Sequence, residues 1–268
     1  MRGQDPHSLS FGQQGFGVDP SFMDLLGERG GSAPPTQPQA ALPIPHGTTV
    51  LALKFEGGVV MAGDRRATEG FSIADERIEK VFPADDYSAV AIAGAAGQAT
   101  EIVKLFQTEL EHYEKVQGDR LSLEGKANRL AQMIRQNFPM ALQGLVVVPL
   151  FGGYDERRRQ GRLFRYDATG GRWEEEDFLA TGSGGKPAKA TIKKRWRPGL
   201  SRQEAVRIAV EALRDASEED IATGGPDPVR GIFPTVKAIT SQGVEDVSGE
   251  DVKRAFDELV AESGTARS

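Results

Sequence analysis

Hydrophobic and polar positions become periodic only from residue 49 onward. Residues 49–55 are β-branched and apolar, Glu56-Gly57-Gly58 predicts a turn, and residues 59–62 are apolar again, so this stretch is expected to form a β-hairpin. Further strands are predicted over residues 87–93, 145–151, 162–167, 173–181, 232–240 and 244–247. Turn sequences at Gly170-Gly171 and Ser241-Gln242-Gly243 join neighbouring strands, which indicates more hairpins.

Helical periodicity fills the intervals between these strands. The first predicted helix presents one apolar face with residues spaced four, four and three apart: Ile102, Phe106, Leu110 and Tyr113. The other helices are predicted over residues 122–138, 186–197, 201–217 and 252–261. Pro139 is expected to end the helix over 122–138, and Ser201 with Glu204 forms a capping-box pattern at the start of another.

The order of these elements predicts an α+β fold. Strands, two helices, strands, two helices, strands and one helix follow each other, and hairpins indicate antiparallel rather than parallel sheets. Two such sheets, each covered on its outer face by a helix pair, give a four-layer α-β-β-α sandwich. No internal repeat is evident in the sequence.

Composition narrows the possible functions. The 268 residues carry a net charge of -6, which argues against a nucleic-acid-binding protein based on bulk basicity. The run Arg157-Arg158-Arg159 is interpreted as a solvated hairpin tip or a subunit contact. The longest apolar run, residues 145–151, is far below the roughly 18 residues of a membrane helix. With no signal peptide pattern either, a soluble, cytoplasmic protein without membrane or nucleic-acid partners is expected.

Scarce cysteine and histidine restrict the catalytic chemistry. The absence of cysteine excludes disulfides, thiolate nucleophiles and cysteine-ligated metals. Histidine occurs only at His7, His46 and His112, and the first two lie in an amino-terminal segment that is expected to lie outside the folded body. A Ser-His-Asp triad or a multi-histidine metal site would depend on His112 alone. If the protein is a hydrolase, its general base is therefore expected to be something other than imidazole, and no metal or cofactor is expected.

The amino-terminal segment, residues 1–47, differs from the rest of the chain. It contains 8 Gly and 7 Pro, and this composition predicts a flexible arm. Cleavage between Gly47 and Thr48 would create a chain that begins with threonine. Its hydroxyl is a nucleophile and its α-amine, with a pKa near 7.7–8.0, is a general base, so one residue supplies both groups. On the tetrapeptide Gly47–Val50 alone, the simpler interpretation is the start of a strand.

Several motifs together resemble the β subunits of the proteasome, which are N-terminal-nucleophile hydrolases. The matching segments occur in order across residues 48–262: Thr48-Thr49-Val50, Met61-Ala62-Gly63-Asp64-Arg65-Arg66-Ala67-Thr68, Ala93-Gly94, Thr181-Gly182-Ser183-Gly184 and Asp220-Ile221-Ala222-Thr223-Gly224-Gly225, with Lys80 at the spacing of the family's active-site lysine. The long arm, the segment Glu109–Lys115 and Gly224-Gly225-Pro226-Asp227 resemble the actinobacterial branch.

This resemblance implies roles for individual residues. Thr48 would be the nucleophile, Lys80 would lower the proton affinity of its hydroxyl, and Asp64 would keep Lys80 oriented and cationic. The N–H of Gly94 would form the oxyanion hole. Ser183, Asp220 and Thr223 would form a hydroxyl–carboxylate network around the Thr48 amine. Arg66 would be a structural support. Gly185-Lys186-Pro187 departs from the family pattern and leaves the local loop open.

The resemblance also implies processing, a substrate site and partners. Residues 1–47 would be a propeptide removed autocatalytically at Gly47–Thr48, and residues 48–268 the catalytic domain. A substrate strand would pair between Ala67-Thr68 and Gly94–Ala96. One of its side chains would enter a small apolar pocket formed by Ala67, Ile78, Ile92, Ala96 and Thr100, so cleavage after hydrophobic residues is expected. Seven-membered β rings would stack with α-subunit rings, gated by a ring-shaped ATPase, and degrade proteins marked by a small protein tag (pupylated proteins).

Other functions fit some of these observations. A non-catalytic ring subunit predicts an uncleaved amino terminus, the simpler two-ring bacterial peptidase has shorter chains without a long arm, and an amidase of the same superfamily would lack the Gly94 and Asp220 segments. Residues 182–186 fail as a phosphate loop because Ala180 replaces the leading glycine and Pro187 the hydroxyl residue.

Overall fold

Two five-stranded antiparallel sheets form the centre of the fold. The computed structural model describes residues 47–69 and 72–265, so the predicted arm lies outside the described residues except for Gly47. One sheet has the order β10 (Phe178–Gly182), β1 (Thr49–Phe55), β2 (Gly58–Gly63), β11 (Thr235–Thr240) and β12 (Gly243–Asp246). The other has the order β5 (Val81–Asp85), β6 (Ser88–Gly94), β7 (Val147–Asp155), β8 (Gln160–Tyr166) and β9 (Arg172–Glu175).

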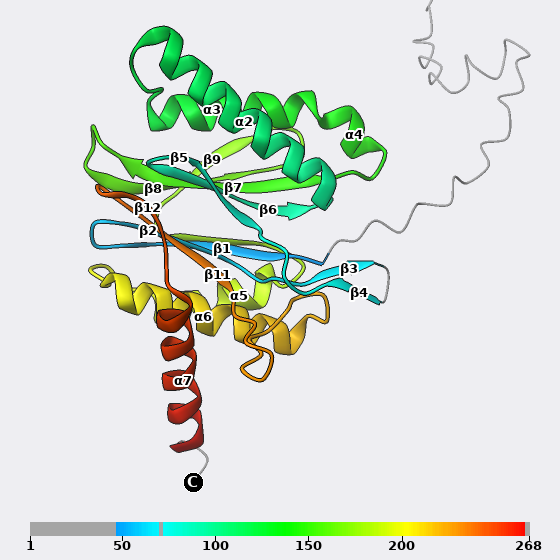
Figure 1. Ribbon diagram of the computed structural model, residues 1–268, viewed down its shortest axis with the longest axis vertical. Coiled ribbons are helices and arrows are strands. Elements are labelled where there is room, and N and C mark those ends of the chain that lie inside the picture. Colours follow the sequence, from blue (N-terminus) through cyan, green and yellow to red (C-terminus); the bar gives the residue numbers. More distant parts are fainter. Residues whose placement is uncertain (1–46, 70–71, 266–268) are drawn as a thin grey trace, which may run out of the picture. The chain divides into compact units, whose positions relative to one another are not determined.

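Helices cover the outer face of each sheet, as the sequence predicted. The β6 sheet is covered by α2 (Ala96–Gln117) and α3 (Leu123–Gln136), and the β1 sheet by α5 (Gly185–Arg195) and α6 (Arg202–Glu219). Figure 1 shows the resulting four layers, with α7 (Gly249–Thr265) extending away from the side of α6. The α-β-β-α sandwich of antiparallel sheets is therefore confirmed.

Alternating side chains explain why the central strands are apolar at nearly every position. In β1, Leu51 and Leu53 pack toward α5 and α6, whereas Val50 and Ala52 pack against the opposite sheet. Successive residues of a strand point to opposite faces, so a strand buried between two layers must be apolar on both. The inter-sheet layer is completed by small and medium side chains such as Ala91, and this packing fixes the position of the residues just before β1.

Two predicted boundaries are wrong for identifiable reasons. The single strand predicted over residues 173–181 is two strands, β9 and β10, which belong to different sheets. The break falls at Glu176-Asp177, where two consecutive acidic residues interrupt the apolar pattern. Pro139 does not end the helical region either. After Asn137 it lies in the first turn of a short helix, α4 (Phe138–Leu142), where its missing N–H has no cost.

Further differences concern short or exposed elements, and one local prediction is confirmed. The small pair β3 (Ala67–Glu69) and β4 (Ser72–Asp75) and the edge strand β5 were not predicted, because the first two are very short and β4 is exposed. Tyr113, expected on the buried face of α2, is 40% exposed. The capping box at Ser201 is confirmed, with reciprocal bonds between Ser201 and Glu204.

Candidate active site

Thr48 directly precedes β1, at the edge of the inter-sheet layer. Its side chain is 6% exposed, and its hydroxyl donates a hydrogen bond of 2.6 Å to the carbonyl oxygen of Gly47. The Thr48 carbonyl accepts a bond of 2.9 Å from the backbone N–H of Ser183. Gly182 permits this contact, because its φ is +97° and a Cβ there would lie 1.8 Å from the Thr48 carbonyl oxygen. The nucleophile candidate is thus fixed directly beside the bond that was predicted to be cut.

Asp64, at the end of β2, is fully buried and joins separate parts of the chain. One carboxylate oxygen accepts bonds from the Lys80 ammonium at 2.6 Å and the Thr49 N–H at 2.7 Å. The other accepts the N–H groups of Arg66 at 3.0 Å and Gly224 at 2.9 Å. A buried carboxylate with this many donors is well satisfied, which makes it a rigid anchor for Lys80.

Lys80 reaches the Gly47 carbonyl from the loop before β5. Its Nζ donates to Asp64, to the Arg66 carbonyl at 2.6 Å and to the Gly47 carbonyl at 3.4 Å. Desolvation by burial lowers the pKa of Lys80, and the adjacent Asp64 carboxylate opposes this shift. The structure therefore brings Lys80, Asp64 and the Gly47–Thr48 bond together, as the resemblance implied.

A hydroxyl–carboxylate network lies on the other side of Thr48. Both Ser183 and Thr223 donate to one oxygen of Asp220 at 2.5 Å, and the Thr48 N–H lies 3.4 Å from the Ser183 hydroxyl. Sequence reasoning missed one member. The hydroxyl of Thr49 lies 2.6 Å from that of Thr223 and accepts the Gly184 N–H at 2.9 Å. The repeated threonine at positions 48 and 49 was the available signal for this contact.

Arg66 and the Gly185-Lys186-Pro187 segment, which differs from the family pattern, both lie beside the network. The Arg66 guanidinium donates to the carbonyls of Ile221 at 3.0 Å and Thr223 at 3.4 Å, so it holds the loop that carries the network. The unusual Gly185-Lys186-Pro187 segment forms the first turn of α5, where proline is tolerated. This departure therefore leaves the contacts of Ser183 intact.

Gly94 lies where β6 passes into α2, and its conformation requires glycine. Its φ is +124°, and a Cβ would lie 2.1 Å from the carbonyl oxygen of Val146. In the uncut chain the Gly47 carbonyl accepts hydrogen bonds from the Thr48 hydroxyl and Lys80. The oxyanion role of the Gly94 N–H stays a prediction.

A cavity of about 130 Å³ opens beside Thr48 and Lys80. The cavity is lined by Thr68, which was predicted to flank the substrate strand, and by the five residues predicted for the pocket: Ala67, Ile78, Ile92, Ala96 and Thr100. Sequence reasoning missed Ala74, Glu79, Phe82 and Ala99, which come from β4, the following loop, β5 and α2. Most of the lining side chains are small or apolar, and the Thr100 hydroxyl donates to the Ala96 carbonyl.

The described part of the chain contains neither a candidate metal-binding cluster nor a candidate membrane-spanning helix. Across residues 47–69 and 72–265, no group of three or more His, Asp or Glu side chains could hold a metal ion. No described helix is both long and apolar enough to cross a lipid bilayer.

The sandwich, with a threonine at the start of its first strand, defines the N-terminal-nucleophile hydrolase fold. The proteasome subunit family matches residues 44–229, so the chain belongs to the proteasome subunit family. It is 55% identical over 253 residues to a proteasome subunit beta of Acidimicrobium ferrooxidans, covering 92% of this chain and 93% of that protein. It is also 55% identical over 238 residues to a proteasome subunit beta of Streptomyces griseus, covering 86% of this chain and 84% of that protein. The predicted resemblance is confirmed.

Proposed function

We propose that the chain is a catalytic β subunit of the proteasome core particle and a threonine endopeptidase that releases its own leader. The observation that carries this proposal is the placement of two groups, a hydroxyl and an ammonium, at one peptide carbonyl. The Thr48 hydroxyl lies 2.6 Å, and Lys80 Nζ 3.4 Å, from the carbonyl oxygen of Gly47. Family membership supports a peptidase, and this geometry supports threonine as its nucleophile.

Self-processing follows from these contacts. Thr48 Oγ1 adds to the Gly47 carbonyl carbon, and the bond from that carbon to the Thr48 nitrogen breaks. The hydroxyl proton ends on the nitrogen, which leaves as a free amine, and an ester joins Gly47 to Thr48 Oγ1. Water then hydrolyses the ester, so the Gly47 carboxylate leaves with residues 1–47. Lys80 stabilises the negative charge that develops on the carbonyl oxygen.

Peptide hydrolysis repeats this chemistry with a new base. The freed amine of Thr48 accepts the proton of its own hydroxyl as the hydroxyl attacks a substrate carbonyl, and it returns the proton to the leaving amine. Ser183, whose hydroxyl lies 3.4 Å from the Thr48 nitrogen, would orient that amine. The Gly94 N–H would bind the oxyanion of the substrate.

The cavity beside Thr48 supports an apolar preference. Its small volume and its alanine and isoleucine lining favour a hydrophobic side chain on the residue that precedes the cleaved bond. A substrate strand would lie between Ala67-Thr68 and the segment that follows Gly94, where main-chain hydrogen bonds would align it.

Assembly and regulation complete the proposal. Seven copies would form a ring, and β rings would stack with α rings to enclose the sites. A ring-shaped ATPase would deliver tagged proteins through the α ring in the cytoplasm. The leader would keep Thr48 blocked until the chamber has closed, which protects other proteins during assembly.

Peptidase activity of active-site variants tests the nucleophile. The protein is co-produced with its α partner, and hydrolysis of a fluorogenic peptide with a hydrophobic residue before the cleaved bond is measured. Thr48→Ala should lower kcat/KM by roughly 10³-fold or more. Thr108→Ala, which removes an exposed hydroxyl on α2, is the matched control and should have normal activity. A fully active Thr48→Ala particle would exclude the proposed nucleophile.

A further inference from the structure

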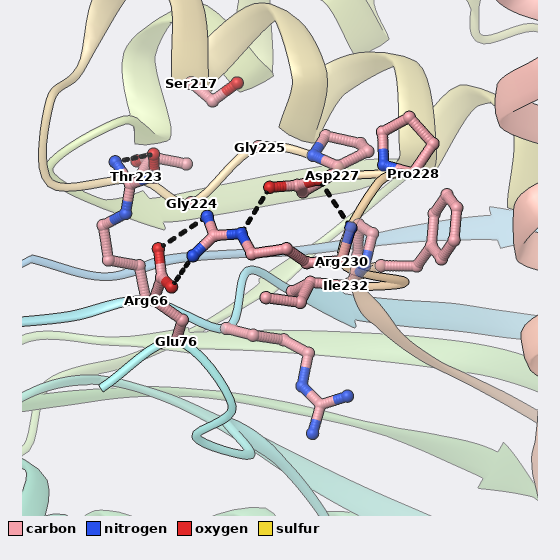
Figure 2. A pocket seen from close by; sticks show the side chains of 14 residues that line it. Arg66, Glu76, Ser217, Thr223, Gly224, Gly225, Asp227, Pro228, Arg230 and Ile232 are labelled. Carbon is pink, nitrogen blue, oxygen red and sulfur yellow. Dashed lines mark hydrogen bonds and ion pairs between the residues drawn. The ribbon is translucent and has the colours of Figure 1, made fainter.

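A second cavity, of about 370 Å³, lies behind the wall of the substrate pocket. It separates the loop that follows Thr223 from the segment around Glu76, and Figure 2 shows Arg230 spanning it between Asp227 and Glu76. Arg230 Nη2 donates to Glu76 at 3.0 Å and Nη1 contacts the other oxygen of the same carboxylate. Its Nε donates to Asp227 at 2.6 Å. A bidentate arginine–carboxylate pair fixes both distance and orientation.

Arg230 itself is held in place by its own loop. Asp227 and Ile232 form a two-bond antiparallel bridge, with N–H to O distances of 2.7 and 2.9 Å. Between them, Asp227 accepts the backbone N–H groups of Val229 at 3.0 Å and Arg230 at 2.9 Å. This compact turn presents the guanidinium at a fixed place, and β11 begins shortly afterwards in the interior of the β1 sheet.

Glu76, by contrast, belongs to a segment with little support of its own. It lies between Ala74 and Ile78, both of which line the substrate pocket. The preceding strand β4 is exposed, and it pairs with β3 in a separate two-stranded sheet. On one side, the Ile78 N–H donates to the Arg65 carbonyl at 3.1 Å and the Arg65 guanidinium donates to the Arg77 carbonyl at 3.0 Å. The ion pair to Arg230 holds the other.

We propose that Arg230 is a positioning residue, which acts through Glu76 to hold the Ala74–Ile78 wall of the substrate pocket in register with Thr48. The same loop carries Asp220 and Thr223 and contacts Asp64 through the Gly224 N–H. The clamp therefore ties the substrate wall to the network around the nucleophile. This inference rests on the proposed peptidase function.

Kinetics of the assembled particle test the clamp. Arg230→Ala should raise KM for peptides with a large apolar residue before the cleaved bond by about five- to ten-fold, with kcat changed less than about two-fold, because the wall that aligns the substrate is loosened while Thr48 and Lys80 are untouched. Arg230→Lys keeps the positive charge but loses the bidentate geometry of the guanidinium, so its KM should lie between those of the wild type and Arg230→Ala. The side chain of Arg230 is 53% exposed, so these variants are expected to fold.

A double-mutant cycle separates the clamp from a general effect. If Arg230 acts through Glu76, then Glu76→Ala, Arg230→Ala and the double variant should share the same KM, whereas independent roles would multiply the two increases. Hydrogen exchange of residues 72–80 should accelerate in all three variants without a change in global melting temperature. Arg254→Ala breaks a comparably exposed ion pair on α7 and should alter neither readout.

The two proposals fail in different ways. A normal KM in Arg230→Ala, multiplied effects in the double variant, or a lower melting temperature with unchanged local exchange would each overturn the clamp. If Thr48→Ala remains inactive in the same experiment, the proposed function survives that result. An active Thr48→Ala particle would instead overturn the proposed function.

Discussion

The buried carboxylate of Asp64 offers a quantitative test of how the site is held together. Asp64→Asn preserves its size but replaces one acceptor oxygen by an NH₂ donor. In one amide orientation the new donor faces the N–H groups of Arg66 and Gly224, and in the other it faces Thr49 N–H and the Lys80 ammonium. Either orientation leaves two donors without their acceptor: two partly buried N–H groups in the first, and two buried groups in the second.

The expected cost follows from burial. Each unsatisfied donor costs about 1–3 kcal/mol, and breaking a buried ion pair costs about 3–5 kcal/mol. These contributions overlap, so we expect Asp64→Asn to lower the free energy of unfolding by about 3–5 kcal/mol, which is a large share of the 5–15 kcal/mol typical of a domain.

Denaturant unfolding in a Thr48→Ala background measures this change with the leader intact in both proteins. Asp257→Asn, which breaks an exposed pair to Lys253 on α7, is the matched control and should change little. A loss below about 1 kcal/mol in Asp64→Asn would refute the reasoning, because breaking a buried ion pair should cost far more than breaking an exposed one.

Three further predictions concern neighbouring groups. Burial lowers the pKa of Lys80 more than the Asp64 carboxylate raises it, so Lys80 should lose its proton at a lower pH than an ordinary lysine does. Leader release should slow as the pH rises through this pKa. Asp64→Asn should shift this decline to still lower pH when the rate of leader release is measured against pH. Gly94→Ala should abolish folding or lower the melting temperature strongly, since its Cβ would lie 2.1 Å from the Val146 carbonyl oxygen, whereas Gly97→Ala meets nothing within 4 Å and should be tolerated in a thermal-shift assay. Thr223→Val, which removes the hydroxyl's bonds to Thr49 and Asp220, should reduce peptidase activity far more than Thr223→Ser, and equal activities would exclude a role for this hydroxyl.

Strong local patterns made most of the architecture predictable from the sequence. The apolar run of β1 and the capping box at Ser201 each have one favourable conformation, and both appear as predicted. The split at Glu176-Asp177 was missed because the period of alternation cannot report which sheet a strand joins. That choice depends on partners far away in the chain.

The site residues illustrate the same limit. Thr48, Asp64 and Lys80 were found because a family resemblance fixes their spacing, and the structure brings them together. Phe82 and Ala99 were missed because they line the pocket only after β5 and α2 have packed beside each other. The Glu76–Arg230 pair, separated by 154 positions, has no local sequence signature at all.

The most direct test of the central claim is the intact mass of the subunit, purified in complex with its α partner. Wild-type protein should lack Met1–Gly47 and begin at Thr48, and Thr48→Ala should retain the full leader. An active particle in which every β subunit keeps its leader, or a Thr48→Ala subunit cut at the same bond in the absence of wild-type copies, would contradict a mechanism in which Thr48 first releases its own amine and then uses it.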